Sequence, residues 1–379
     1  MDQKLAVLFM PDDMTLTKEQ APLMLRPILF CPILTWMVEE LMGRGIERFF
    51  IVSDKRAHDM MRPYVPENAD VVYVDGARHG EELLTLLKDE KGSVLIVNGA
   101  VLPVGVFSGG AVYSADAKEC CKVLKEHGAF AAFPKGAEIT KGFLPVGDDE
   151  ELRSAQDMCR RKIADKHFAA GVSIMDPNNT YIDPRVKIGS GTVILPGTIL
   201  RGRTVIGKNC TIGPNAMIRD CMVGDETEVN ASQLNESTVG AHTTVGPFAY
   251  VRPNSKIGDH VKVGDFVEIK NSVIGNGTKI SHLTYVGDSD CGERINFGCG
   301  TVTTNYDGFK KFRCTIGDDA FIGCNTNLIA PVTVGNGSYI AAGSTITDEV
   351  PADSLAIARE RQVNKPGWAE QWRAAHEKK

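Results

Sequence analysis

A histidine, a tyrosine and two cationic residues lie close together in the second half of the sequence. His282 and Tyr285 are three residues apart, and Arg252 and Lys270 precede them with a spacing of 18 residues. Two cations suit a phosphorylated ligand, because Arg binds phosphate through paired N–H groups and Lys adds a second charge. A histidine can accept a proton from an attacking amine near neutral pH. From the residues alone, a solvated corner for the two cations and a structural histidine remain equally open.

A six-residue period predicts the element that would position these side chains. Aliphatic residues recur every six residues, with two shifts of register, and glycine often follows them. The series comprises Ile182, Ile188, Ile194, Leu200, Ile206, Ile212 and Ile218, then Val239, Val245, Val251, Ile257, Val263 and Ile269, then Ile274, Ile280 and Val286, and finally Ile316, Ile322, Leu328, Val334, Ile340 and Ile346. This pattern is typical of a parallel β-helix, in which three hexapeptides complete a coil of about 18 residues.

The β-helix geometry makes the spacing of the candidate residues meaningful. Inward aliphatic side chains stack on their equivalents about 4.8 Å away in the next coil. Arg252 and Lys270 should therefore lie on one face in adjacent coils, and His282 on a neighbouring face. The period is also interrupted by the segment 305–311, and such a loop can reach over a neighbouring surface. A β-helix has the shape of a triangular prism with shallow sides. A deep site is therefore easier to build between two such prisms, which favours an oligomer.

The first part of the chain has a different pattern. Apolar runs at 5–9, 49–52, 71–74 and 94–97 predict strands, and 32–42 and 81–87 predict helices. Their alternation indicates an α/β domain with a mostly parallel sheet. We therefore expect four parts: an α/β domain at 1–147, a connecting helix at 148–170, the β-helix at 171–350, and a tail at 351–379 that completes a coenzyme site.

Composition narrows the possible partners and compartments. The net charge is −6 and no long basic run occurs, so we expect no nucleic-acid partner. We found no secretory signal and no apolar stretch of about 18 residues, so we expect a cytoplasmic protein without membrane insertion. The ten cysteines show no zinc-type pairing and are expected to be reduced thiols, and no metal site is predicted.

Several motifs in the second half resemble one known family. The segment from about residue 171 to 368 is similar to the acetyltransferase half of bifunctional N-acetylglucosamine-1-phosphate uridyltransferase/glucosamine-1-phosphate acetyltransferases. The motifs are Tyr250-Val251-Arg252-Pro253, Gly264-Asp265-Phe266-Val267-Glu268-Ile269-Lys270, His282-Leu283-Thr284-Tyr285-Val286-Gly287-Asp288, Asn305-Tyr306-Asp307-Gly308 and Ile329-Ala330-Pro331-Val332-Thr333-Val334-Gly335. The resemblance implies a left-handed β-helix that forms a homotrimer with sites between subunits.

The resemblance also assigns roles to individual residues. His282 matches the general base. The positions matched to substrate binding are Arg252, Lys270, Tyr285, Asn296 and Lys311. The positions matched to the acetyl group and acetyl-CoA are Cys299, Asn305, Tyr306, Cys324, Ala342 and Arg359. Cys299 and Cys324 depart from the family, which usually has alanine and often serine there, and we expect these small changes to affect coenzyme packing only.

The first half resembles the uridyltransferase domain of that family only in outline. The family has a glycine-rich loop after its first strand, whose backbone amides hold nucleotide phosphates. Here 10–14 follow the first expected strand, and no glycine precedes Gly43. The family also holds magnesium with an aspartate after a central strand, where this chain has Asn98. An amide supplies no charge to a hard cation, so magnesium is not expected.

These observations predict transfer of the acetyl group of acetyl-CoA to the amine of glucosamine-1-phosphate. The product would feed UDP-N-acetylglucosamine and cell-envelope synthesis, with uridyltransferase activity lost. One alternative is a fully bifunctional enzyme with an altered nucleotide site. Another is a non-catalytic trimer that senses a sugar nucleotide or acts as a scaffold. Nucleotide binding by the segment 1–150 would separate the bifunctional alternative from the leading prediction.

Overall fold

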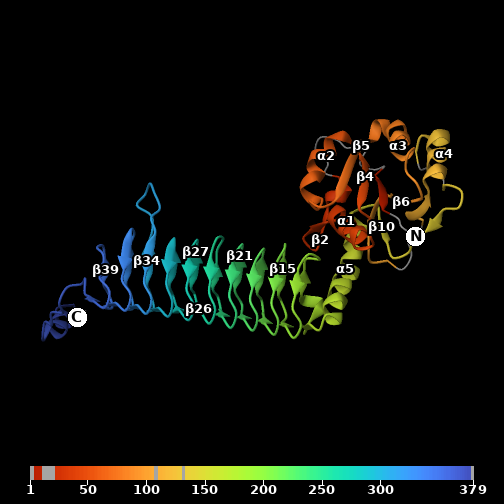
Figure 1. The fold of residues 1–379 in the computed structure, drawn as a ribbon. Helices are drawn as coiled ribbons and strands as arrows, with labels where there is room; N and C mark the ends of the chain where they lie inside the picture. Colours follow the sequence, from red (N-terminus) through yellow and green to blue (C-terminus); the bar gives the residue numbers. More distant parts are fainter. Residues whose placement is uncertain (1–3, 11–21, 106–109, 130–132, 377–379) are drawn as a thin grey trace. The chain divides into compact units, whose positions relative to one another are not determined.

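The computed structural model describes residues 4–10, 22–105, 110–129 and 133–376, and its chain divides into two compact units. The first unit comprises Met1–Val205 and the second Ile206–Lys379. The positions 11–14, where the glycine-rich loop would stand, lie outside the described residues. Figure 1 shows the α/β fold of the first unit and the coils of the second.

The first unit contains a mostly parallel sheet with the strand order β5-β4-β1-β6-β8-β9. The strands are β1 (Leu5–Phe9), β4 (Arg48–Ser53), β5 (Asp70–Asp75), β6 (Ser93–Asn98), β8 (Val112–Asp116) and β9 (Glu138–Ile139). The first four are parallel, whereas β8 and β9 run antiparallel to their neighbours. The predicted strands are confirmed: β1 has the predicted bounds, and the other three have one more residue at each end.

Helices join and cover these strands. They are α1 (Ile33–Gly43), α2 (Lys55–Met61), α3 (His79–Leu87), α4 (Ala117–His127) and α5 (Asp149–Ala169). The apolar faces of α3 and α4 pack on the sheet through Leu83, Leu87 and Leu124, next to Val7 and Ile96. Burial of such side chains contributes roughly 1.5–3 kcal/mol each. Short strand pairs complete this part: β2 (Pro27–Ile28) with β3 (Cys31–Pro32), and β7 (Ala100–Leu102) with β10 (Leu144–Val146).

Helix α5 begins where its sequence provides an N-cap. The side chain of Asp148 accepts hydrogen bonds from the backbone N–H groups of Glu150 and Glu151 at 2.9 and 2.8 Å. These bonds satisfy two of the otherwise unpaired amides of the first turn. The first hexapeptide strands follow in the same unit: β11 (Ser173–Ile174), β12 (Tyr181–Ile182), β13 (Lys187–Ile188), β14 (Val193–Ile194) and β15 (Ile199–Arg201), with β16 (Val205–Ile206) at the boundary.

The second unit is a left-handed parallel β-helix with three sheets, which we call sheets I, II and III. Sheet I contains β17 (Thr211–Ile212), β20 (Glu228–Val229), β23 (Thr244–Val245), β26 (Lys262–Asp265), β29 (Lys279–His282), β32 (Asn296–Phe297), β35 (Phe321–Ile322), β38 (Tyr339–Ile340) and β40 (Leu355–Ala356). Sheet II contains β18 (Met217–Arg219), β21 (Gln233–Asn235), β24 (Tyr250–Val251), β27 (Glu268–Lys270), β30 (Tyr285–Gly287), β33 (Val302–Thr304), β36 (Asn327–Ile329) and β39 (Thr345–Ile346). Sheet III contains β19 (Met222–Val223), β22 (Thr238–Val239), β25 (Lys256–Ile257), β28 (Val273–Ile274), β31 (Ser289–Cys291), β34 (Cys314–Ile316) and β37 (Val332–Val334). The predicted fold class is confirmed in both parts.

The shifts in the hexapeptide period have a simple structural explanation. All the aliphatic residues of the period point inward and are buried. Between Ile218 and Val239 the coils continue through buried Val223, Val229 and Leu234, so three of the four intervals shorten to five residues and the repeat does not break. The only long insertion in the described coils starts at Asn305, after β33, and forms the loop that projects near β34 in Figure 1. A final helix, α6 (Trp368–His376), follows the coils.

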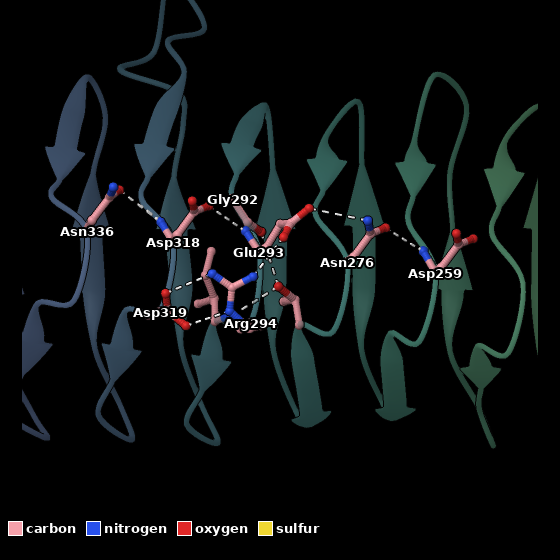
Figure 2. Close-up of polar contacts among 10 residues, drawn as sticks. Asp259, Asn276, Gly292, Glu293, Arg294, Asp318, Asp319 and Asn336 are labelled. Carbon is pink, nitrogen blue, oxygen red and sulfur yellow. Dashed lines mark hydrogen bonds and ion pairs between the residues drawn. The ribbon is translucent and has the colours of Figure 1, made fainter.

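The corner between sheets III and I explains why glycine follows so many of the inward residues. Figure 2 shows Asp and Asn side chains in successive coils that bond to the backbone of the preceding coil. Asp318 accepts from the N–H of Glu293 at 2.8 Å, and Asn336 accepts from the N–H of Asp318 at 3.0 Å. A Cβ at Gly292 would lie 2.2 Å from the Asp318 carboxylate. Glycine therefore leaves room for a bond that stabilises the corner.

Candidate functional site

The corner between sheets I and II carries one continuous column of candidate residues. Val263, Ile280, Phe297, Ile322 and Ile340 pair in register on successive strands of sheet I. The residues two positions later are therefore equivalent, and they are Asp265, His282, Cys299, Cys324 and Ala342. We call this set the corner column. Its members are about 4.8 Å apart from one coil to the next.

The imidazole of His282 has a carboxylate partner that the sequence analysis missed. Its Nδ1 lies 2.6 Å from Oδ1 of Asp265, and the hydrogen bond lowers the pKa of Asp265 below its usual value. An ionised Asp265 holds the proton on Nδ1 and leaves the lone pair on Nε2. The side chain of His282 remains 57% exposed, so this nitrogen can meet a ligand. The signal was available, because Asp265 precedes His282 by one coil.

A second group lies on the outer face of sheet II, directly after the same corner. The register places Lys270 opposite Gly287, while Tyr285 begins β30. A Cβ at Gly287 would lie only 2.3 Å from the hydroxyl oxygen of Tyr285, so the phenol crosses the backbone at this glycine. The phenol also accepts a hydrogen bond from Asn305 Nδ2 at 3.4 Å. We call Lys270, Tyr285, Asn305 and Lys311 the sheet II cluster.

Cations gather in the sheet II cluster. The neighbouring side chain of Lys311 lowers the pKa of Lys270, because it holds a second ammonium beside the first. The carboxylate of Asp288 acts in the opposite direction and raises the pKa of Lys270. It also contacts the side-chain amides of Asn271 and Asn305. Two adjacent ammonium groups repel each other, and a multiply charged anion bound between them would relieve that repulsion. Asn305 is almost fully buried, which fixes the start of the insertion.

Arg252 lies one coil before Lys270 on sheet II, as the spacing predicts. The backbone N–H of Arg252 donates to the carbonyl of Ile269 at 2.8 Å, next to Lys270. Its Nη1 donates to Glu268 at 2.7 Å, and this bond raises the pKa of the guanidinium. Glu268 was not foreseen. It occupies part of the guanidinium and leaves the remaining N–H groups for a ligand.

The structure unites some of the remaining predicted residues with these groups and separates others. The side chain of Arg359 comes within 3.6 Å of the Cβ position at Gly343, directly after Ala342, so it extends the corner column. Tyr306 forms an antiparallel bridge with Lys311 across the base of the insertion, and its hydroxyl donates to the carbonyl of Gly308 at 2.5 Å. Asn296 pairs in register with Lys279 and Phe321 on sheet I, on the other side of inward Phe297 from Cys299.

The described residues contain no group of three or more His, Cys, Asp or Glu side chains that could hold a metal ion. Among the helices in the described ranges, none is long and apolar enough to cross a membrane.

The repeats match the family model described as bacterial transferase hexapeptide (six repeats) over 185–220, 236–271 and 313–348. A protein named Bifunctional protein GlmU from Caldanaerobacter subterraneus subsp. tengcongensis is 51% identical over 228 residues, which are 60% of this chain and 50% of that protein. A protein of the same name from a Geobacillus species is 49% identical over 249 residues, which are 66% of this chain and 54% of that protein. These proteins are homologues of the chain. They confirm the resemblance, and the chain spans about half of their length.

One solved structure, described as an Arabidopsis UDP-N-acetylglucosamine acyltransferase, is 18% identical and covers 54% of this chain and 76% of that chain, with a TM-score of 0.31.

Proposed function

We propose that the chain transfers the acetyl group of acetyl-CoA to the amine of glucosamine-1-phosphate. The observation that carries this proposal is the arrangement of the two groups around one corner. His282 with its Asp265 partner lies at the corner that precedes sheet II, and Lys270, with Lys311 beside it, lies at the end of β27, opposite Gly287 at the end of β30. A strand of three residues spans about 10 Å. A sugar with an amine at one side and a phosphate at the other fits such a separation.

The two substrates would then contact different residues. Lys270, Lys311 and the free N–H groups of Arg252 would hold the phosphate, and Tyr285 would contact the sugar. The coenzyme arm would follow the corner column past Cys299, Cys324 and Ala342, where side chains are small, with Arg359 beside it. This places the thioester end next to His282.

The reaction follows from this placement. Nε2 of His282 takes a proton from the amine, whose lone pair attacks the thioester carbonyl. The tetrahedral intermediate collapses, the carbon–sulfur bond breaks, and the coenzyme A thiolate leaves and takes up a proton. Asp265 stabilises the imidazolium formed on the way. Each of these steps uses groups within about one coil of the corner.

We also propose that the working form is a homotrimer with each site completed by a neighbouring subunit. His282 and the sheet II cluster lie on an open face, and open faces rarely enclose a small ligand. A second prism against this corner would exclude water from the thioester.

The deciding experiment measures release of coenzyme A thiol from acetyl-CoA by the full chain, with glucosamine-1-phosphate as acceptor. We expect turnover with this acceptor and much slower turnover with glucosamine, which lacks the phosphate. Ligand binding without any acetyl transfer would instead support a sensor or scaffold. Equal rates with both acceptors would remove the phosphate role of Lys270 and Lys311.

A further inference from the structure

Two cysteines occupy equivalent positions in adjacent coils of the corner column. Phe297 pairs with Ile322 in register, so Cys299 and Cys324 lie side by side two residues later. The backbone carbonyl of Cys299 accepts a hydrogen bond from the N–H of Asn325 at 2.8 Å, which joins the two corners directly. Adjacent parallel strands are about 4.8 Å apart, and a disulfide spans Cα atoms separated by roughly 4.4–6.8 Å. The Cα atoms of Cys299 and Cys324 are therefore separated by a distance that a disulfide can span.

These two thiols are also accessible in a way that most others are not. All ten cysteines lie in the described part of the chain, where Cys324 is exposed and Cys299 half-buried. Burial raises the pKa of the Cys314 thiol to about 11 and that of the Cys159 thiol to about 12. Because the thiolate is the nucleophile, such buried thiols react slowly at neutral pH. Cys299 and Cys324 are less buried than these thiols.

We propose that Cys299 and Cys324 form a reversible disulfide by exchange with the disulfide of coenzyme A. This inference rests on the proposed function, because it uses the same coenzyme track. The thiolate of exposed Cys324 attacks one sulfur of the coenzyme disulfide, the sulfur–sulfur bond breaks, and one coenzyme A thiolate leaves. The thiolate of Cys299 then attacks the sulfur of Cys324 and releases the second coenzyme A. Two protein thiols are oxidised and one disulfide is reduced, so two coenzyme A thiols form.

The bridge would act on the coenzyme site itself. It ties together two coils at the positions that the pantetheine arm passes, and it replaces two small thiols with a fixed covalent link. Acetyl-CoA binding should weaken when the coenzyme pool is oxidised and recover when it is reduced. Coenzyme A disulfide would thus bind to the coenzyme site, and its reaction there would weaken the binding of acetyl-CoA.

The test incubates the reduced full chain with coenzyme A disulfide and follows the intact mass and a peptide map. We expect a loss of two hydrogens per chain, a link between the peptides of Cys299 and Cys324, and weaker acetyl-CoA binding that dithiothreitol restores. A link that joins other cysteines, or an unchanged mass, would overturn the proposal. Glutathione disulfide at the same concentration should react at least about tenfold more slowly, because it has no site that raises its local concentration. Equal rates would overturn the role of the coenzyme track.

Variants separate the two exchange steps. Cys299→Ala should trap the mixed disulfide, seen as one coenzyme A added to Cys324, whereas Cys324→Ser should abolish both the adduct and the link. Cys121→Ser, which removes another partly exposed thiol, is the matched control and should leave the link unchanged. The peptide map detects the disulfide directly and does not depend on acetyl transfer. A chain that forms the link but does not acetylate glucosamine-1-phosphate would therefore disprove the proposed function and leave this inference standing.

Discussion

At the scale of single residues, the pairing of His282 with Asp265 is the most informative contact. A histidine on an exposed corner has several rotamers, and a carboxylate at 2.6 Å selects one of them. The same carboxylate sets which nitrogen carries the lone pair. Asp265 therefore acts as a positioning residue, and its effect should be visible only through His282.

We expect His282→Ala to lower kcat by about 10² to 10⁴ with little change in acetyl-CoA binding, because the imidazole matters when the proton moves. Asp265→Asn should lower kcat less, and the double variant should be no slower than His282→Ala. The measurement is steady-state kinetics of thiol release. A matched pair exists at His242, whose Nδ1 lies 3.3 Å from Glu226, and Glu226→Gln should leave kcat unchanged. Additive losses for His282 and Asp265 would contradict the positioning role.

The second prediction at this scale concerns the two neighbouring lysines. Lys311 lowers the pKa of Lys270, so Lys270 loses its proton at lower pH than an ordinary lysine as the pH rises. As the pH is raised above neutral, the affinity for inorganic phosphate should therefore fall at a lower pH than it would beside an ordinary lysine. In Lys311→Gln the affinity at neutral pH should be weaker, but its fall should move to higher pH. Calorimetry across this range measures both.

Lys279→Gln is the control for the lysine prediction, because Lys279 is exposed on β29 of sheet I and outside the sheet II cluster. It should change neither the affinity nor the midpoint. If Lys311→Gln leaves the midpoint where it was, the two ammonium groups do not interact and the phosphate site needs another explanation.

At the scale of elements, Gly287 shows how the regular coil makes room for the phenol of Tyr285. A strand residue with a side chain here would occupy the place of the Tyr285 phenol. Gly287→Ala should displace the ring and raise the KM for glucosamine-1-phosphate by about tenfold, equivalent to about 1.4 kcal/mol. The KM for acetyl-CoA should change little, and kinetics with each substrate varied separately will check this. Gly43→Ala, where a Cβ meets nothing within 4 Å, is the control. Equal changes in both KM values would indicate general damage to the coil.

The coils were largely predictable because each inward residue contacts its equivalents at a fixed sequence spacing. Local periodicity therefore encodes contacts that in other folds are distant in sequence. The pattern failed where an inward position is polar, as at Thr303, whose hydroxyl accepts from the N–H of Gly287 at 2.7 Å. It also failed where a segment shortens to five residues, as around Val229. Neither exception follows from hydrophobicity alone.

In the α/β part, the missed elements had local signals. Helix α4 is capped by the side chain of Asp116, which accepts from the N–H of Lys118 at 2.9 Å, and it ends at Gly128 with a φ of 66°. Both residues are common at such ends. The partners of the site residues were harder to foresee. Nothing in the sequence separates Asp265 and Glu268 from ordinary solvated acids, and only the coil register places them beside His282 and Arg252.

At the scale of the whole molecule, the open corner makes a prediction about assembly. The 41.1 kDa chain should purify as a trimer of about 120 kDa, because a closed site needs a second prism face. Light scattering coupled to size exclusion will measure the mass. Substitutions that yield a monomer should also abolish acetyl transfer. A monomer with full activity would contradict sites shared between subunits.

The final prediction separates the two activities that the resemblance in the sequence implies. The full chain should acetylate glucosamine-1-phosphate but should not form UDP-N-acetylglucosamine from UTP. Nucleotidyl transfer concentrates negative charge on oxygens that need backbone donors and a metal. The sequence has no glycine before Gly43 to let backbone amides approach a phosphate closely, and Pro11 has no N–H at all.

Asn98, at the end of β6, stands where the family has the aspartate that holds magnesium. Its side-chain oxygen is buried, and an amide oxygen lacks the charge of the carboxylate that magnesium prefers. The proposed acetyl transfer would use residues beyond position 250 and would need none of these groups. The measurement is pyrophosphate release with UTP, magnesium and N-acetylglucosamine-1-phosphate, beside thiol release in the same preparation. Pyrophosphate release as fast as acetyl transfer would mean that another part of the first unit holds the nucleotide and supplies the missing charge.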